Sequence, residues 1–110
     1  MKTDRELLEL AAKAIGLGIK WEEKHNCHWI ELGQGLPIDV WSPIDNDGDA
    51  LRLAVDLKLD IKNYEDYVHV WYQDFFSTGP EYFYGDPRKA TRRAIVIAAA
   101  EIQLQKEREQ

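Results

Sequence analysis

Apolar residues recur at the three- and four-residue spacing of a helix in three parts of the chain. These parts run from Leu7 to Ile15, from Ala50 to Leu57 and from Ala90 to Ile102. This spacing places the apolar side chains on one face, so each part is expected to form a helix that packs against a core. The predicted helices are residues 3–16, 46–58 and 87–106.

Local signals mark where these helices begin. Thr3 followed by Glu6 is a capping box, in which each side chain bonds the free backbone N–H of the other residue. Asp86-Pro87 places a capping carboxylate before a proline at the first helical position, where no N–H is needed. Asn46 followed by Asp49 is a third capping pair, so the three signals support helix starts at residues 3, 46 and 87.

The segments between the helices have the pattern of strands. "YVHVWY", residues 67–72, is rich in β-branched and aromatic residues, and Leu59 and Ile61 alternate with polar neighbours. Short connections favour antiparallel pairing of neighbouring strands. The predicted strands are residues 19–23, 28–32, 59–63 and 67–72, and residues 38–43 are expected to be an extended connection.

The run "AIVIAAA", residues 94–100, constrains the architecture further. On a helix, Ile95, Val96 and Ile97 point in different directions, so the middle of the last helix is apolar all round. Such a helix is buried on more than one side. It is therefore either the central element of the domain or part of a contact with another subunit.

Together, these elements predict an α+β fold: about four mainly antiparallel strands covered by three helices. The chain of 110 residues has room for one core. We therefore expect a single domain over residues 1–110.

Composition narrows the class of function. The formal charge of -6 argues against nucleic acid as a partner, because a nucleic-acid binder needs a basic face. The charged start of the chain, the single cysteine Cys27 and the lack of a long apolar run favour a cytoplasmic protein with no membrane contact.

Alternating carboxylates in "DNDGDALRLAVDL", residues 45–57, allow two interpretations. A calcium loop beginning at Asp45 would use Asp45, Asp47, Asp49 and Asp56, but an alanine would take the place of the turn glycine. The apolar helical pattern has also begun within this loop. The carboxylates are therefore expected to start a helix, where they complement the helix dipole, and not to hold a metal.

The cluster "HNCH", residues 25–28, could supply metal ligands or a nucleophile. Zinc needs three or four ligands, and the only other histidine is His69. A reactive Cys27 would need a base held by a third group. The expected role of His25, Cys27 and His28 is structural, within a hairpin, and the sequence indicates no metal or cofactor.

An aromatic-rich segment, residues 71–84, is the main candidate for a contact surface. Seven of the twelve aromatic residues fall here, around the loop signal "STGP". The apolar residues of the helices and strands already fill a core of this size, so some rings are expected on the surface. The predicted partner-contact residues are Phe75, Phe76, Tyr82 and Tyr84.

A second candidate site lies at the start of the last helix. Its residues Arg88, Lys89, Arg92 and Arg93 are basic, which opposes the helix dipole unless an anion binds there. The alternative is that these side chains pair with acidic groups of the chain itself, and the second interpretation is favoured.

Several motifs resemble the phage ABA sandwich domain family, small bacteriophage and prophage proteins without a settled function. The resemblance rests on "WSP" with Trp41 and Pro43, on "DGDALRL", and on "DPRKATRRA". More distantly, NinX-type proteins of lambdoid phages also end with a short polar residue, a proline and an alanine-rich helix. The resemblance implies an α-β-α sandwich and a phage or prophage origin, and it implies no catalytic residues.

These observations lead to two functional hypotheses. The first is a non-enzymatic phage or prophage binding protein, with a host or phage protein as partner and a host-defence component as one candidate target. The second is a small nucleotide- or anion-binding protein or enzyme that uses the basic helix start. A homo-oligomer also remains open. An enzyme is expected to have a concave pocket with convergent polar groups, and a binding module is expected to have an apolar patch.

Overall fold

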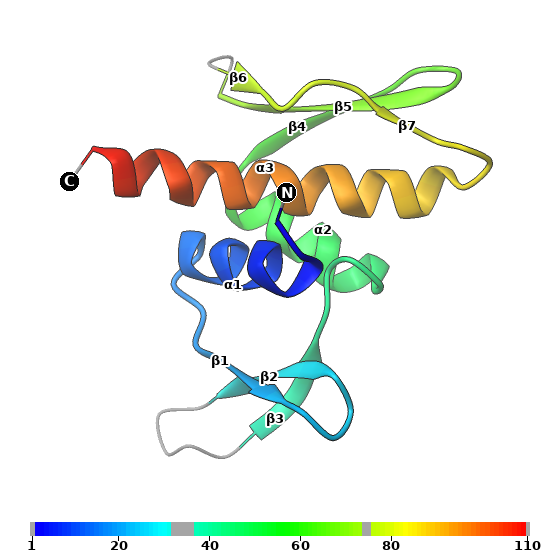
Figure 1. Cartoon of the computed structure of the whole chain (residues 1–110). Helices are drawn as coiled ribbons and strands as arrows, with labels where there is room; N and C mark the ends of the chain where they lie inside the picture. Colours follow the sequence, from blue (N-terminus) through cyan, green and yellow to red (C-terminus); the bar gives the residue numbers. More distant parts are fainter. Residues whose placement is uncertain (1, 32–36, 74–75, 110) are drawn as a thin grey trace.

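The computed structural model describes residues 2–31, 37–73 and 76–109, without the side chains of Pro37, Ile38 and Phe76. Its three helices are α1 (Asp4–Ala14), α2 (Asp47–Asp56) and α3 (Pro87–Arg108). They alternate along the chain with two antiparallel sheets, so the predicted α+β class is confirmed (Figure 1).

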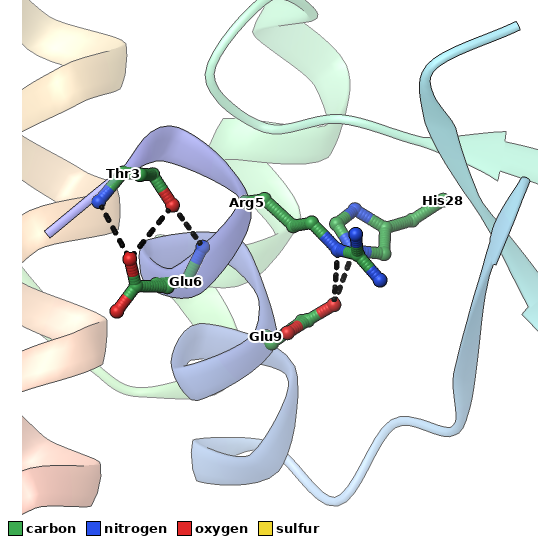
Figure 2. Close-up of polar contacts among 5 residues, drawn as sticks. All are labelled: Thr3, Arg5, Glu6, Glu9 and His28. Carbon is green, nitrogen blue, oxygen red and sulfur yellow. Dashed lines mark hydrogen bonds and ion pairs between the residues drawn. The ribbon is translucent and has the colours of Figure 1, made fainter. Parts of the chain in front are cut away.

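The capping box predicted at the start of α1 is present. Thr3 Oγ1 accepts a hydrogen bond of 3.1 Å from the backbone N–H of Glu6, and Glu6 Oε1 accepts one of 3.2 Å from the backbone N–H of Thr3 (Figure 2). At its other end α1 stops before Gly16, whose φ of 69° is readily adopted only by glycine.

The other two helices also start where the sequence predicts. The side chain of Asn46 accepts from the backbone N–H of Asp49 at 2.8 Å, and the side chain of Asp86 accepts from that of Lys89 at 3.1 Å. Pro87 is the first residue of α3. Local capping chemistry therefore sets the start of all three helices.

The first sheet, sheet A, joins α1 to α2. It consists of β1 (Ile19–Glu22), β2 (Cys27–Glu31) and β3 (Pro37–Trp41), in the order β1-β2-β3. The strand β3 lies where an extended connection was expected. It pairs antiparallel with the free edge of β2, which satisfies backbone groups that a simple connection would leave to water. A proline is tolerated at its first position.

The second sheet, sheet B, joins α2 to α3. Its long hairpin is β4 (Leu59–Asn63) with β5 (Tyr67–Tyr72), as predicted. Two short strands, β6 (Phe76–Ser77) and β7 (Glu81–Tyr82), pair with opposite ends of β5. These two-residue strands are too short to leave a pattern in the sequence.

The helix α3 is the central element of the domain. It contacts α1 and α2 on one side and β5 and β7 on the other. Its residues Ile95, Val96 and Ala99 are all buried, which confirms that this helix is covered on more than one side. The expected alternative of a subunit contact is not needed to explain the apolar run.

The order of layers differs from a sheet held between helices. Sheet B lies above α3, α1 and α2 lie below it, and sheet A lies beyond them, so the helices are between the sheets (Figure 1). Each hairpin pairs only with strands next to it in sequence, which gives two narrow sheets instead of one wide one. The most apolar helix then occupies the middle.

The apolar face of α2 is narrower than expected. Ala50, Leu53 and Ala54 are buried, but Leu51 and Val55 are 61% and 65% exposed. These two residues are one turn apart on the outer surface of the helix. Among the described residues, no helix is long and apolar enough to span a membrane.

Candidate functional site

Six rings lie side by side along sheet B and its adjoining turns. The residues are contributed by β5, by β7 and by the chain just before and after these strands. We call this group the ring row, and it consists of Tyr64, Tyr67, His69, Trp71, Tyr82 and Tyr84.

Each ring of the row contacts at least one other. Tyr64 and Tyr67 stack with centroids 4.5 Å apart, and His69 lies 4.8 Å from Trp71. Tyr67 also lies 6.4 Å from His69 and 5.6 Å from Tyr82. A last contact of 6.3 Å joins Tyr82 to Tyr84, so the six rings form one connected group.

The alternation of β5 explains why these rings face outward. Val68 and Val70 are 0% and 1% exposed and belong to the core beside α3. Tyr67, His69 and Trp71 occupy the alternate positions and therefore point to the opposite face of the sheet. In Figure 1 no described element lies over that face.

Much of the ring surface is open to solvent. Tyr84 is 92% exposed and Tyr82 is 48% exposed, with Tyr64 at 38% and Trp71 at 36%. Rings of this size usually bury most of their surface, in a core or against a partner. A connected group of exposed rings is typical of an interaction surface.

Two of the four predicted contact residues belong to the ring row. Tyr82 and Tyr84 are exposed, whereas their neighbour Phe83 is half-buried against the core. Phe75 and the side chain of Phe76 lie outside the described residues. Tyr82 and Tyr84 are therefore accessible to a partner, and their role in a contact stays a prediction.

Sequence reasoning missed most of the row because it looked for a loop. Tyr67, His69 and Trp71 lie on a regular strand, and Tyr64 is in the turn that precedes it. The alternation of rings with valines in "YVHVWY" was the available signal. Since the valines suffice for the core side, the rings between them had to face away from it.

Two of the four basic residues at the start of α3 contact other groups of the chain. Arg92 donates to Asp47 Oδ1 at 2.7 Å and to the backbone carbonyl of Ile44 at 3.0 Å. Arg93 lies 3.3 Å from Asp4 Oδ1 and 3.4 Å from Glu81 Oε1. The chain's own acidic groups thus engage two of the four predicted side chains.

The remaining two basic residues, Arg88 and Lys89, are exposed. The backbone N–H of Lys89 is bonded by the Asp86 side chain, so the cap already occupies part of the helix start. These contacts agree with the interpretation that the basic cluster serves the fold.

The "HNCH" cluster is organised by one carboxylate. Glu22 Oε2 accepts from Trp29 Nε1 at 2.7 Å and lies 2.9 Å from His25 Nδ1 and 3.8 Å from Cys27 Sγ. The bond from Trp29, followed by that from His25, lowers the pKa of Glu22. His25 and Cys27 therefore share one side of the hairpin, beside Glu22.

Cys27 is not arranged as a nucleophile. Partial burial raises the pKa of its thiol, and the adjacent Glu22 carboxylate acts in the same direction. A raised pKa keeps the sulfur protonated and unreactive. Among the described residues, no group of three or more His, Cys, Asp or Glu side chains is placed to hold a metal ion.

His28 turns to the other side of the hairpin, toward α1. It is 1% exposed, and its Nε2 lies 3.0 Å from Glu9 Oε2 (Figure 2). Glu9 also accepts from Arg5 Nε at 3.1 Å. The hydrogen bond to His28 is the main reason that the pKa of Glu9 is lowered, and the bond to Arg5 adds to the effect.

Arg5 and Trp21 complete this contact between α1 and sheet A. The Arg5 guanidinium lies 4.3 Å from the centroid of the Trp21 ring, and Trp21 meets His28 edge to face at 4.8 Å. Four side chains from three elements thus join the helix to the sheet. Their rings and charged groups stabilise the packing of α1 on sheet A.

A hollow of about 660 Å³ lies between the start of α1, sheet A and the loop before α2. Its carboxylates are held by the chain itself. Asp45 Oδ2 accepts from Ser42 Oγ at 2.8 Å, and Asp49 accepts from the Ser42 backbone N–H at 3.0 Å and from Arg52 at 2.7 Å. The hollow therefore has polar walls, in which Asp45 and Asp49 are engaged by other groups of the chain.

The same bonds settle the geometry of the alternating carboxylates. Asp47 and Asp49 are in the first turn of α2, and Asp45 precedes the cap. Their side chains bond Arg92, Ser42 and Arg52 in separate directions. They start a helix, as the sequence indicates, and do not surround a common point.

Comparisons with models of known protein families, with curated proteins and with solved structures found no match to this chain. The resemblance to the phage ABA sandwich domain family therefore rests on the motifs alone.

Proposed function

We propose that this chain is a small non-enzymatic binding protein that contacts a partner protein through the ring row. The observation that carries the proposal is the connected group of exposed rings on the outer face of sheet B. Tyr and Trp are the residues that most often anchor protein contacts, because they bury a large area with little loss of side-chain freedom.

A role of the ring row in partner contact explains its position better than a role in folding does. The core side of β5 is already filled by Val68 and Val70. The rings add apolar surface that water covers poorly, and no core contact compensates for it. Burial against a partner would turn this unfavourable exposure into binding energy.

The hollow beside sheet A gives weaker support to an enzyme. Its carboxylates Asp45 and Asp49 are engaged by Ser42 and Arg52, and Cys27 is kept protonated. General acid–base or nucleophilic catalysis needs a group that is free to exchange a proton or attack. The anion-binding alternative is likewise weakened, because Arg92 and Arg93 contact acidic groups.

The phage or prophage origin belongs to the same proposal. Its support is the resemblance of the "WSP", "DGDALRL" and "DPRKATRRA" motifs. A phage protein of this kind would act in the cytoplasm of its host, and a host or host-defence protein would be its partner. The acidic charge of -6 is compatible with a soluble partner-binding role.

Affinity capture from host lysate tests the proposal. The decisive variant combines Trp71→Ser and Tyr82→Ser, which removes two exposed rings from the row. The control combines Leu51→Ser and Val55→Ser, which removes a similarly exposed apolar pair from α2. We expect the control to capture the same proteins as the unmodified chain and the ring variant to lose them.

Two results would contradict the proposal. In one, both variants retain capture, which would place the contact outside the ring row. In the other, only the α2 variant loses capture, which would assign the contact to Leu51 and Val55. Light scattering on the same proteins shows whether the partner is a second copy of this chain, since the ring variant would then change from oligomer to monomer.

A further inference from the structure

We infer that the partner segment that docks on the ring row is basic and stacks arginine side chains on the exposed faces of the rings. This inference rests on the proposed function of the row as a contact surface. It adds the chemical class of the partner, which is argued from the charges around the rings and from the attraction of ring faces for cations.

Unpaired acidic side chains border the ring row. Asp60 lies directly opposite Trp71 in the pairing of β4 with β5. Glu65 and Asp66 are in the turn between Tyr64 and Tyr67, and all three carboxylates are exposed. None of the three forms an ion pair with a described residue, so their charges are available to a basic partner.

The row already holds one cation of its own. Lys62 pairs with His69 across the strands, and its Nζ lies 5.3 Å from the centroid of the Tyr64 ring. The face of an aromatic ring carries negative charge density and attracts cations at this range. The surface thus favours positive charge both through its carboxylates and through its rings.

The exposed faces of the rings favour a planar cation. Tyr64 and Tyr67 stack with centroids 4.5 Å apart, and Tyr67 lies 5.6 Å from Tyr82, so the rings contact one another and a cation binds on their outer faces. A guanidinium is flat, weakly hydrated and able to stack, so it covers a ring face better than an ammonium does.

Arg5 shows how this chain holds a guanidinium on a ring face. The Arg5 guanidinium lies over the Trp21 ring at 4.3 Å while it also contacts the Glu9 carboxylate. A ring and a carboxylate together hold that arginine. The ring row offers the same combination, with Asp60 beside Trp71 and with Glu65 and Asp66 beside Tyr64 and Tyr67.

Nucleic acid bases also stack on aromatic rings, but the charge of this surface favours a basic peptide over nucleic acid. The phosphates of a single strand would meet Asp60, Glu65 and Asp66 on a chain whose net charge is -6. Binding of single strands depends on a positively charged groove along the backbone. The same rings are therefore expected to accept a basic peptide and to repel an oligonucleotide.

Four probes distinguish these possibilities in nuclear magnetic resonance titrations of the labelled protein. Three are short peptides in which glycine alternates with arginine, lysine or glutamate, and the fourth is a single-stranded thymidine oligonucleotide. The chain has four tryptophans, whose indole N–H signals report on separate places. We expect the arginine peptide to shift the Trp71 signal and to leave those of Trp21, Trp29 and Trp41 in place.

Two matched charge variants test the carboxylates. One combines Asp60→Asn with Glu65→Gln beside the row, and the other combines Asp56→Asn with Glu23→Gln elsewhere, so both lose the same charge. At low salt, removal of each bordering charge is expected to weaken arginine-peptide binding by roughly two- to five-fold. The remote pair is expected to change it less than two-fold. Tyr82→Ala is expected to weaken it by about ten-fold.

The outcomes separate this inference from the proposed function. If the lysine or glutamate peptide or the oligonucleotide binds as well as the arginine peptide, or if Trp71 does not respond, the inference is wrong. Capture from lysate that still depends on Trp71 and Tyr82 would then leave the proposed function standing. If the two charge variants weaken binding equally, the arginine peptide senses only net charge, and the inference is again wrong.

Discussion

The two sheets contain similar rings but use them differently. In sheet A, Trp41 is part of the core, Trp21 contacts His28 and Arg5, and Trp29 donates to Glu22. In sheet B, the rings of the row contact one another, and four of the six are exposed. Residue type therefore does not distinguish a binding surface from a structural one. The two differ in the groups of the chain that their rings contact.

The difference follows from what each sheet has beside it. Sheet A faces α1, which supplies Arg5 and Glu9 to its rings. The inner face of sheet B meets α3 through valines, and its outer face meets no described element (Figure 1). Sheet A thus packs on α1 through aromatic and charged side chains. Sheet B packs on α3 through aliphatic side chains, and its rings lie on the other face.

The largest expected effect separates the two faces of β5. Val68→Asp places a charge at a position that is 0% exposed beside α3, where it would have no partner. We expect this variant to be unfolded by circular dichroism. The control is His69→Asp at the next position, on the outer face. A folded Val68→Asp protein would show that the inner face is less tightly packed than the contacts indicate.

A smaller effect is expected when a ring is removed from each sheet. Trp21→Ala removes the contacts with His28 and Arg5 and is expected to lower the free energy of unfolding by about 2 kcal/mol. Trp71→Ala, on the outer face of sheet B, is expected to lower it by about 1 kcal/mol or less, because the ring is 36% exposed. Urea denaturation measures both. Equal losses would remove the distinction between the sheets.

The contact between α1 and sheet A also predicts a dependence on pH. The ordinary carboxyl pKa of 4.5 is lowered at Glu9 in the folded state. Its stabilisation is therefore present above pH 4.5 and is lost as the pH falls through the lowered value. Because the Glu9 side chain is 41% exposed, the loss is expected to be about 0.5 kcal/mol or less.

Comparison with Glu9→Gln isolates this effect. The difference in unfolding free energy between the unmodified chain and the variant is expected to shrink as the pH is lowered below 4.5. Urea denaturation at a series of pH values measures it. A difference that grows toward low pH would have the wrong sign and would refute the role of the Glu9 carboxylate.

Metal removal has the smallest expected effect. The carboxylates of Asp45, Asp47 and Asp49 bond groups of the chain itself, so no metal is needed to hold them. Addition of EDTA, calcium or zinc is expected to leave the melting temperature within about one degree. A shift of several degrees would reassign these carboxylates or the "HNCH" cluster to a metal site.

The features that the sequence predicts well are local. The three helix starts depend on side chains that bond backbone groups three residues away, as with Thr3, Asn46 and Asp86. The two long hairpins likewise join segments that are adjacent in sequence. Such contacts are visible in a short window of residues, so both elements and their boundaries follow from the pattern.

The features that the sequence does not predict depend on distant segments. The strand β3 forms because it pairs with the free edge of β2. The helices lie between the two sheets because α3 is covered on both sides. Arg92 and Arg93 find their partners Asp47, Asp4 and Glu81 in other elements. The ring row is predictable only in part. The alternation of rings and valines is visible in the sequence, but the exposure of the rings depends on which elements cover the sheet.

The most direct test of the ring row compares two adjacent residues of β5 with the same substitution. Val70→Ser removes an inner side chain, and Trp71→Ser removes an outer ring. Thermal melting and partner capture are measured on the same samples. We predict that Val70→Ser lowers the melting temperature by several degrees more than Trp71→Ser does but retains capture below that temperature, whereas Trp71→Ser loses capture. A Trp71→Ser protein that is destabilised as much as Val70→Ser, or that captures its partner undiminished, would contradict the account.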